Sequence, residues 1–82
     1  MSLAKELLAS RRAGRGAPPS WLVEAAHQAR RTAGSRGYWV VRARAVEAGL
    51  RPFDAMVAWQ MAQGHSLDTA IRIAAAIAAR KR

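Results

Sequence analysis

The stretch RARAVEAGLRPFDAMVAW, residues 42–59, gives the clearest indication of how this chain folds. Ala45 and Gly49 have the spacing found in helix-turn-helix units, where a small alanine lets two helices cross closely and a glycine permits the turn. Pro52 suits the first turn of a following helix, and Asp54 in that turn faces the positive end of the helix dipole. The stretch therefore predicts a hairpin of two helices.

The second helix of this hairpin lacks the chemistry of a DNA-reading helix. A recognition helix offers hydrogen-bond donors and acceptors to base edges near its N-terminus. The corresponding positions here are occupied by Pro52, Phe53, Met56 and Val57. These residues favour a core, so the hairpin is expected to serve the fold. The following helix pair has more polar side chains at the same positions, namely Asp68, Thr69 and Arg72, although the Asp68 carboxylate would repel phosphate.

Capping residues and breakers on either side of the hairpin outline further helices. Ser2, Ser20 and Ser66 are expected N-caps, while Gly34 and Gly64 are expected helix ends. Helices are predicted from residue 3 into the breaker-rich segment 13–20, over 21–33, 38–49 and 52–63, and from residue 67 onward.

Apolar periodicity assigns a contact face to each of these helices. The second helix is expected to pack through Trp21, Leu22, Ala25, Ala26 and Ala29. The third helix has two apolar faces, one made by Trp39, Ala43, Val46 and Leu50 and the other by Val41, Ala45 and Ala48. This pattern predicts a central helix with Trp39 in the core and Tyr38 freer. The fourth is apolar all round, as expected for the centre of a domain or half of an interface, and the fifth packs through Leu67, Ala70, Ala74 and Ile77.

The fold class that follows is all-α, a compact small bundle of four to five short helices with a helix-turn-helix-like central hairpin. Its 82 residues form a single domain, 1–82, in which residues 1–16 are expected to be a basic helix and linker that is loosely attached. No apolar run approaches the roughly 20 residues of a membrane span. Cysteine is absent, so nothing requires an oxidising compartment, and a cytoplasmic protein is expected.

Positive charge is the strongest functional indication. Fourteen Lys and Arg residues face five Asp and Glu residues, which gives a formal net charge of +9 and favours polyanionic partners. Five arginines and no acid lie between residues 30 and 44, around a glycine-containing loop that lets the backbone approach a phosphate. The predicted binding residues are Arg30, Arg31, Arg36, Tyr38, Arg42, Arg44 and Arg51. Tyr38 is included because an exposed aromatic ring can stack on an unpaired base.

These observations favour a small, non-catalytic binding protein that contacts nucleic acid mainly through phosphates, with a regulatory role as one use of such binding. The alternative is a phage- or plasmid-type interaction module or inhibitor that binds an acidic, nucleic-acid-handling surface of a larger host complex, because Trp, Tyr and Arg dominate interface energetics. A secondary face for such a partner, or for a homodimer, is predicted at Met56, Trp59, Gln60 and Gln63. Action at an anionic membrane is a weaker third class, since the alanines of the last helix contribute little insertion energy.

Catalytic and metal sites have little support in this sequence. The five acids are scattered, and none pairs with another as a general acid and base would. His27 and His65 lie far apart in sequence, without a cysteine or carboxylate at ligand spacing. Neither an enzyme activity, a metal nor a cofactor is expected.

Overall fold

The computed structural model describes residues 17–80, and this part of the chain is all helical, as predicted. Its elements are α2 (Ser20–Ala33), the short 3-10 turn η1 (Gly34–Arg36), α3 (Gly37–Glu47), α4 (Pro52–Ala62) and α5 (Leu67–Arg80). The predicted helix that Ser2 caps and the loose attachment of residues 1–16 lie outside the described residues. The boundaries of the remaining helices agree with the sequence expectations to within a few residues.

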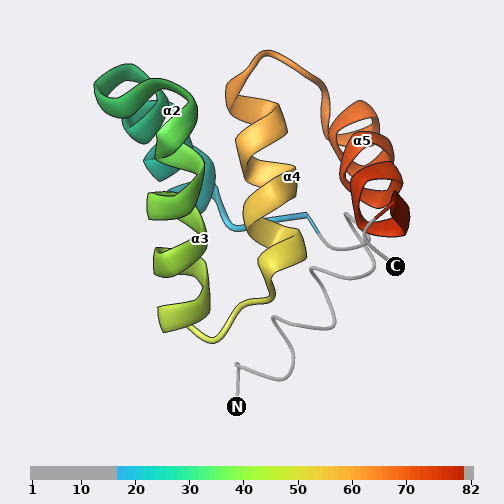
Figure 1. The fold of residues 1–82 in the computed structure, drawn as a ribbon, viewed down its shortest axis with the longest axis horizontal. Helices are drawn as coiled ribbons and strands as arrows, with labels where there is room; N and C mark the ends of the chain where they lie inside the picture. The colour runs from blue at the N-terminus through green and yellow to red at the C-terminus, as the bar shows by residue number, and fades with distance from the viewer. Residues whose placement is uncertain (1–16, 81–82) are drawn as a thin grey trace.

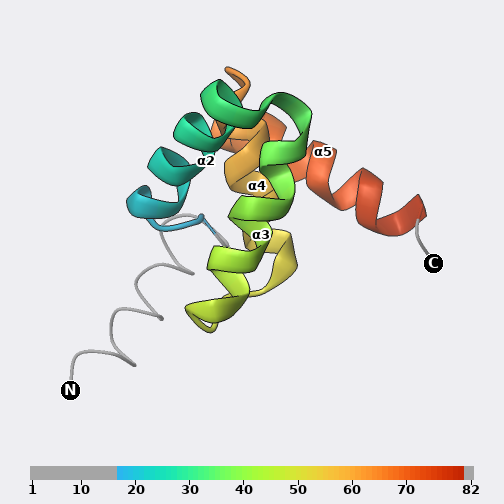
Figure 2. The ribbon, with the colours of Figure 1, turned by 60° about the vertical axis from the view of Figure 1, so that its left-hand side comes forward.

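Helix α4 is the centre of the bundle. It lies between α2 and α3 on one side and α5 on the other (Figures 1 and 2). Its side toward α2 and α3 buries Ala55, Ala58 and Trp59, whereas its side toward α5 buries Val57. Of the two alternatives for this all-round apolar helix, the structure therefore shows the buried centre of the domain.

Small side chains fill most of the contact among α2, α3 and α4. The fully buried residues there include Leu22, Val41 and four alanines, Ala26, Ala45, Ala55 and Ala58. Because alanine and glycine side chains are short, the helix axes can approach closely. A close approach occurs at Gly37, where a Cβ atom would lie 2.5 Å from the backbone oxygen of Ala29.

The turn between α3 and α4 is a glycine C-cap. The N–H of Leu50 donates to the carbonyl of Ala45 (2.8 Å) and the N–H of Gly49 donates to that of Val46 (3.0 Å). Gly49 has φ +84°, the left-handed conformation that glycine adopts without a Cβ clash. On the other side of the turn the Asp54 carboxylate accepts a hydrogen bond from the Arg51 N–H (3.1 Å), which satisfies a donor at the start of α4. The predicted roles of Gly49 and Asp54 are confirmed.

Of the two predicted serine caps in the described residues, one is confirmed and the other is wrong. Ser66 precedes α5 and its hydroxyl oxygen accepts a hydrogen bond from the Thr69 N–H (3.3 Å), as expected of an N-cap. Ser20 instead is the first residue of α2, where Pro19 is the N-cap and no side chain makes a capping bond. The Ser20 prediction is wrong because the backbone carbonyl of Pro19 already accepts the first helical N–H groups, those of Leu22 and Val23.

One residue of the predicted α2 contact face is misplaced. Leu22, Ala25, Ala26 and Ala29 are buried as expected, but Trp21 is 44% exposed. Trp21 follows the helix start directly and lies about 100° from Leu22 around the axis, at the edge of the packed stripe. The contact face of α2 is therefore narrower than the sequence pattern indicated, because α3 and α4 cover only the alanine side of the helix.

Candidate nucleic-acid interface

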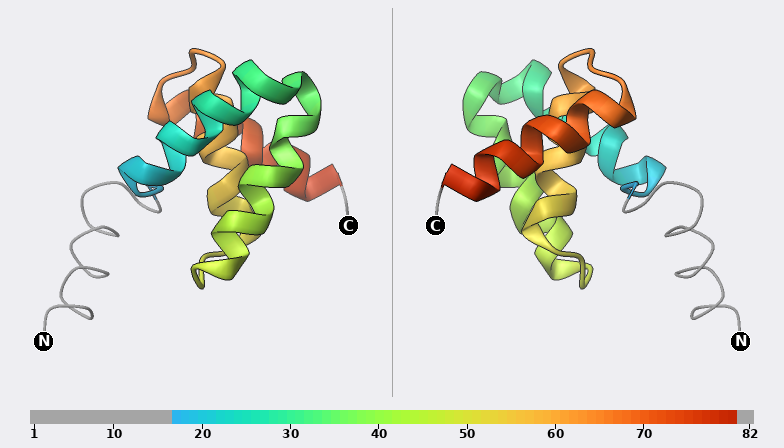
Figure 3. Two further views of the ribbon diagram at one scale, coloured as in Figure 1. Left: turned by 90° about the vertical axis from the view of Figure 1, so that its left-hand side faces the viewer. Right: turned by 90° about the vertical axis from the view of Figure 1, so that its right-hand side faces the viewer.

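Three arginines lie at the corner where α2 turns into α3. Arg30 and Arg31 occupy the last turn of α2, and Arg36 ends η1. The ribbon reverses direction here (Figure 3). Gly34 has φ +59°, which permits the turn, and Gly37 packs against α2. The corner therefore holds three guanidinium groups within seven residues, and we call Arg30, Arg31 and Arg36 the corner arginines.

The two arginines of α3 lie on different flanks of the helix. Arg42 lines a groove formed with α4 and α5. Arg44 is two residues later, about 200° around the axis, on the flank that Gly37 presents to α2. Of the five arginines predicted between residues 30 and 44, three therefore lie at the corner and one on each flank of α3.

All arginines of the described part are exposed, and they have few acidic neighbours. Within residues 17–80 the one ion pair joins Arg51 and Asp54, whose Nε and Oδ2 atoms are 3.8 Å apart. The side chain of Arg51 is itself 71% exposed, so this pair is a weak surface contact. The corner arginines, Arg42 and Arg44 therefore present positive charge to solvent without a carboxylate partner among these residues.

The exposure of the two neighbouring aromatic residues is the reverse of the prediction. Trp39 is 60% exposed, whereas Tyr38 is half-buried and packs against the core, with its ring 6.2 Å from that of Trp59 in an edge-to-face arrangement. The packed face of α3 is centred on Tyr38, Val41 and the helix-crossing alanine Ala45. Trp39 lies about 100° beyond Tyr38 and outside that face.

The wider expectation for α3 is corrected in the same way. Of its two predicted apolar faces, the one with Val41 and Ala45 is buried, although its third member Ala48 is exposed. Of the other face, Trp39, Ala43 and Val46 are exposed to solvent, and only Leu50, beyond the end of α3, packs against the core. Val40 beside it is 50% exposed, so the outer surface of α3 is largely apolar. The face with Gly37, Val41 and Ala45 is the buried one because these side chains permit a close approach to α2 and α4, which a tryptophan would prevent.

Two side chains lie next to the Trp39 ring. The Tyr38 ring meets it edge-to-face at 5.2 Å between centroids. The Arg42 guanidinium lies over its ring at 5.8 Å from the centroid, within the range of a cation–π interaction. A large aromatic surface thus lies in the open next to a positive charge.

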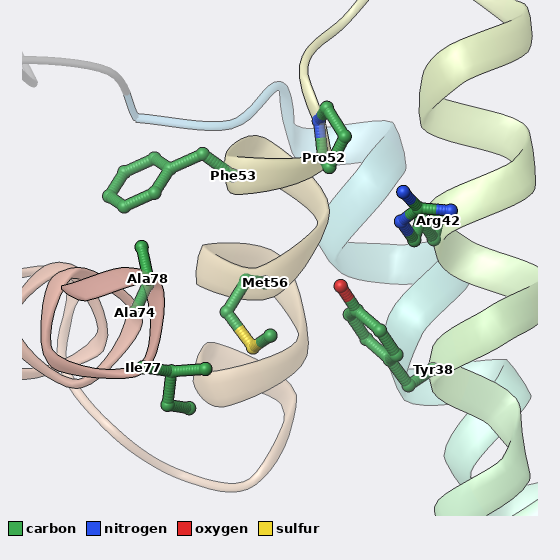
Figure 4. A pocket seen from close by; sticks show the side chains of 8 residues that line it. All are labelled: Tyr38, Arg42, Pro52, Phe53, Met56, Ala74, Ile77 and Ala78. Carbon is green, nitrogen blue, oxygen red and sulfur yellow. The ribbon is translucent and has the colours of Figure 1, made fainter. Parts of the chain in front are cut away.

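A shallow groove of about 220 Å³ runs beside this surface, between α3 and α5 over the start of α4. Its α3 wall carries the Tyr38 hydroxyl and the Arg42 guanidinium, and its floor and far wall are apolar (Figure 4). The apolar lining residues are Pro52, Phe53, Met56, Ala74, Ile77 and Ala78. The groove therefore combines an apolar bed with one cationic edge.

The predicted secondary face on α4 does not exist as one surface. Trp59 is only 9% exposed and belongs to the core, and Met56 packs against the α4–α5 cluster. Gln60 is half-buried, and Gln63 is exposed and hydrogen-bonded to Gln60 (3.4 Å). The prediction fails at Trp59 because α2 and α3 cover the side of α4 that carries it.

Two further features bear on the class of protein. Among residues 17–80 no group of three His, Cys, Asp or Glu side chains is placed to hold a metal ion. None of the helices described is both long and apolar enough to cross a bilayer. On α5 the residues Asp68, Thr69 and Arg72 are exposed, as the sequence indicated.

Sequence reasoning missed the exposure of Trp39 and the place of Arg42 in the groove. The signal for Trp39 was present in the small residues Gly37, Val41 and Ala45, whose spacing of four marks a face that can pack closely. The groove depends on how α5 crosses α4, for which the sequence holds no comparable signal. Compared with known proteins, the chain matches no family model, and no curated protein or solved structure is similar enough to count as a match.

Proposed function

We propose that this protein binds nucleic acid, mainly through backbone phosphates. The observation that carries the proposal is the set formed by the corner arginines, Arg42 and Arg44, which are exposed and have no acidic partner among residues 17–80. Guanidinium groups match phosphate oxygens in geometry and stay charged at every physiological pH. A net charge of +9 on 82 residues adds a long-range attraction for a polyanion.

Contacts to phosphates explain the surface better than sequence-specific reading does. The hairpin of α3 and α4 resembles a helix-turn-helix only in outline, because its second helix is buried on both sides. Helix α4 has no row of polar side chains to offer to base edges. The proposed binding therefore depends little on base sequence. The proposal further comprises binding without catalysis, a cytoplasmic location and a regulatory role.

The proposal is tested by the salt dependence of binding to fluorescent DNA and RNA of random sequence. For duplex DNA, log K falls against log salt with a slope of about −0.9 for each phosphate contacted. We expect the double variant R30Q/R31Q, at the corner, to lose affinity and to have a slope shallower by about 2. The matched control is R72Q/R80Q, which removes two exposed arginines of α5. Its net charge equals that of R30Q/R31Q, so the two variants differ only in where the charge is lost.

Two results would contradict the proposal. If the wild-type protein binds neither DNA nor RNA at low salt, the function is wrong. If both double variants weaken binding equally, the positive charge acts diffusely and the corner is not the interface.

The groove favours a second candidate function, binding of an acidic protein partner. An amphipathic helix could pack apolar side chains against Met56 and Ile77 and place carboxylates near Arg42. The negative charges of the partner would then lie opposite the one cationic edge of the groove. This corresponds to a phage- or plasmid-type module that binds an acidic surface of a host complex. Tight binding to such a partner with a shallow salt slope, together with no affinity for nucleic acid, would favour this function over the first.

A further inference from the structure

We infer that the nucleic acid is single-stranded and that Trp39 is the platform on which one unpaired base stacks. The inference rests on the proposed function and adds to it the form of the ligand. Its starting point is an unusual exposure, because Trp39 leaves 60% of its surface open while Tyr38 and Trp59 are packed inward. A tryptophan side chain has only two rotatable bonds, so stacking on it loses little conformational freedom.

Charges on both sides of Trp39 suit a strand that passes over the ring. Arg36 is three residues before Trp39 and Arg42 three residues after it, and Arg36 already has helical backbone angles (φ −70°, ψ −17°). Residues three apart are neighbours on a helix surface. A base on the Trp39 ring would therefore have the Arg36 guanidinium available for the phosphate on one side and, once it moves off the ring, the Arg42 guanidinium for the phosphate on the other. Proteins that bind single strands commonly combine stacking rings with a basic track in this way.

A single strand fits the surface around Trp39 better than a duplex does. Apart from Arg42, the outward residues of α3 that neighbour Trp39 are Val40, Ala43 and Val46, none of which has a side-chain donor or acceptor for a base edge in a groove. In a duplex the faces of the bases are covered by their neighbours, so the ring could reach one only after unstacking. An unpaired base offers its face at no such cost.

A second copy of this chain is a poor occupant of the same face. Each copy would bring Arg36 and Arg42 beside the same two residues of the other, and each carries a net charge of +9. Like charges placed opposite each other in an interface are unfavourable. The arginines beside the ring thus point to an anionic ligand.

The experiment compares W39A, W39F and a control, W21A, by fluorescence anisotropy with a labelled 20-nucleotide oligothymidine and a duplex of equal length. We expect W39A to weaken binding to the single strand about tenfold, the effect of losing one stacked base. W39F retains a ring and should retain most of the affinity. W21A removes a comparably exposed tryptophan from α2 and should change neither ligand's affinity. Duplex affinity should be the same in all four proteins.

Each other outcome has a separate meaning. If W39A binds the oligothymidine as tightly as the wild type does, the stacking platform is overturned, while loss of binding in R30Q/R31Q would leave the phosphate-binding function in place. If W39A weakens the duplex as much as the single strand, the preference for unpaired bases is wrong. If W39A changes only the elution volume in gel filtration, the face belongs to a second copy. Circular dichroism of W39A checks that the exposed substitution leaves the helices intact.

Discussion

Gly37 sets the distance between α2 and α3, and it does so by lacking a side chain. A Cβ atom at this position would lie 2.5 Å from the Ala29 carbonyl oxygen and 2.7 Å from its carbon, closer than atoms of a real side chain approach backbone. The two helices would have to separate to accept it. The crossing in turn orients the start of α3 and with it Arg36 and Trp39.

We therefore expect Gly37→Ala to destabilise the protein by about 1–3 kcal/mol, the usual cost of overpacking. The higher helix propensity of alanine opposes this by at most about 1 kcal/mol, so the clash decides the sign. Urea denaturation followed by circular dichroism measures the change. Ser35→Ala, two residues earlier and exposed, should stay within about 0.5 kcal/mol of the wild type. A G37A protein as stable as the wild type would show that α2 and α3 can separate freely.

The error at Trp39 shows what apolar periodicity can and cannot predict. Trp39, Ala43 and Val46 recur at helical spacing, so the sequence correctly indicates a helix there. The same helix carries a second stripe through Val41 and Ala45, and spacing alone does not say which stripe is buried. The choice depends on how closely the partner helices approach, which is a property of Ala29 and Gly37 together. Tyr38 and Trp39 exchange their expected roles for this reason.

At the scale of single elements, the helix ends were the most predictable feature. Gly49 and Gly64 both adopt the left-handed conformation, with φ +84° and +102°. Both are followed by a residue whose N–H bonds back into the preceding helix, from Leu50 to Ala45 and from His65 to Gln60. Glycine is the residue that permits this backbone, so its position in the sequence fixes the end of the helix. The central place of α4 was likewise foreseeable as one of two alternatives, since apolar residues surround it.

Helix α5 offers a test of capping at the element scale. The Ser66 hydroxyl accepts the Thr69 N–H and donates to the Thr69 hydroxyl (3.1 Å). Ser66→Ala removes the acceptor and should lower the stability by about 1 kcal/mol, whereas Ser66→Asn keeps an acceptor and should stay near the wild type. The midpoint of urea unfolding measures both. Equal losses in the two variants would mean that the hydroxyl acts through Thr69 and not as a cap.

At the scale of the whole molecule, the charge was predictable and its arrangement was not. The excess of arginine is a fact of composition, and arginines rarely stay buried without a partner, so their exposure follows. Their distribution around α3 depends on the packing of Gly37 against α2 on one flank and on the groove beside Arg42 on the other. Both depend on how the helices pack against one another, which helical spacing in the sequence does not specify. The sequence therefore identifies the residues of the candidate site but does not predict their arrangement in space.

The same charge should make the fold and the proposed ligand respond to salt in opposite directions. Arginine side chains repel one another in the folded protein, and only one ion pair within residues 17–80 offsets this. Sodium chloride screens such repulsion, because the Debye length falls from about 30 Å at 0.01 M to about 3 Å at 1 M. We expect the melting temperature of the free protein to rise by about 5 °C over the range 0.01–0.5 M, corresponding to roughly 1 kcal/mol for a domain of this size.

Added oligothymidine should raise the melting temperature at 0.01 M salt, because a ligand that binds the folded state stabilises it. The effect should disappear at 0.5 M, because salt weakens the affinity for the oligonucleotide. Differential scanning calorimetry with and without the oligonucleotide measures both trends. The R30Q/R31Q variant is the control, since it should flatten the salt dependence of the free protein and reduce the stabilisation by ligand together. A melting temperature that falls with salt in the free protein would mean that attractive charge pairs dominate its surface. The corner arginines would then be engaged within the fold and would not be available to a phosphate backbone.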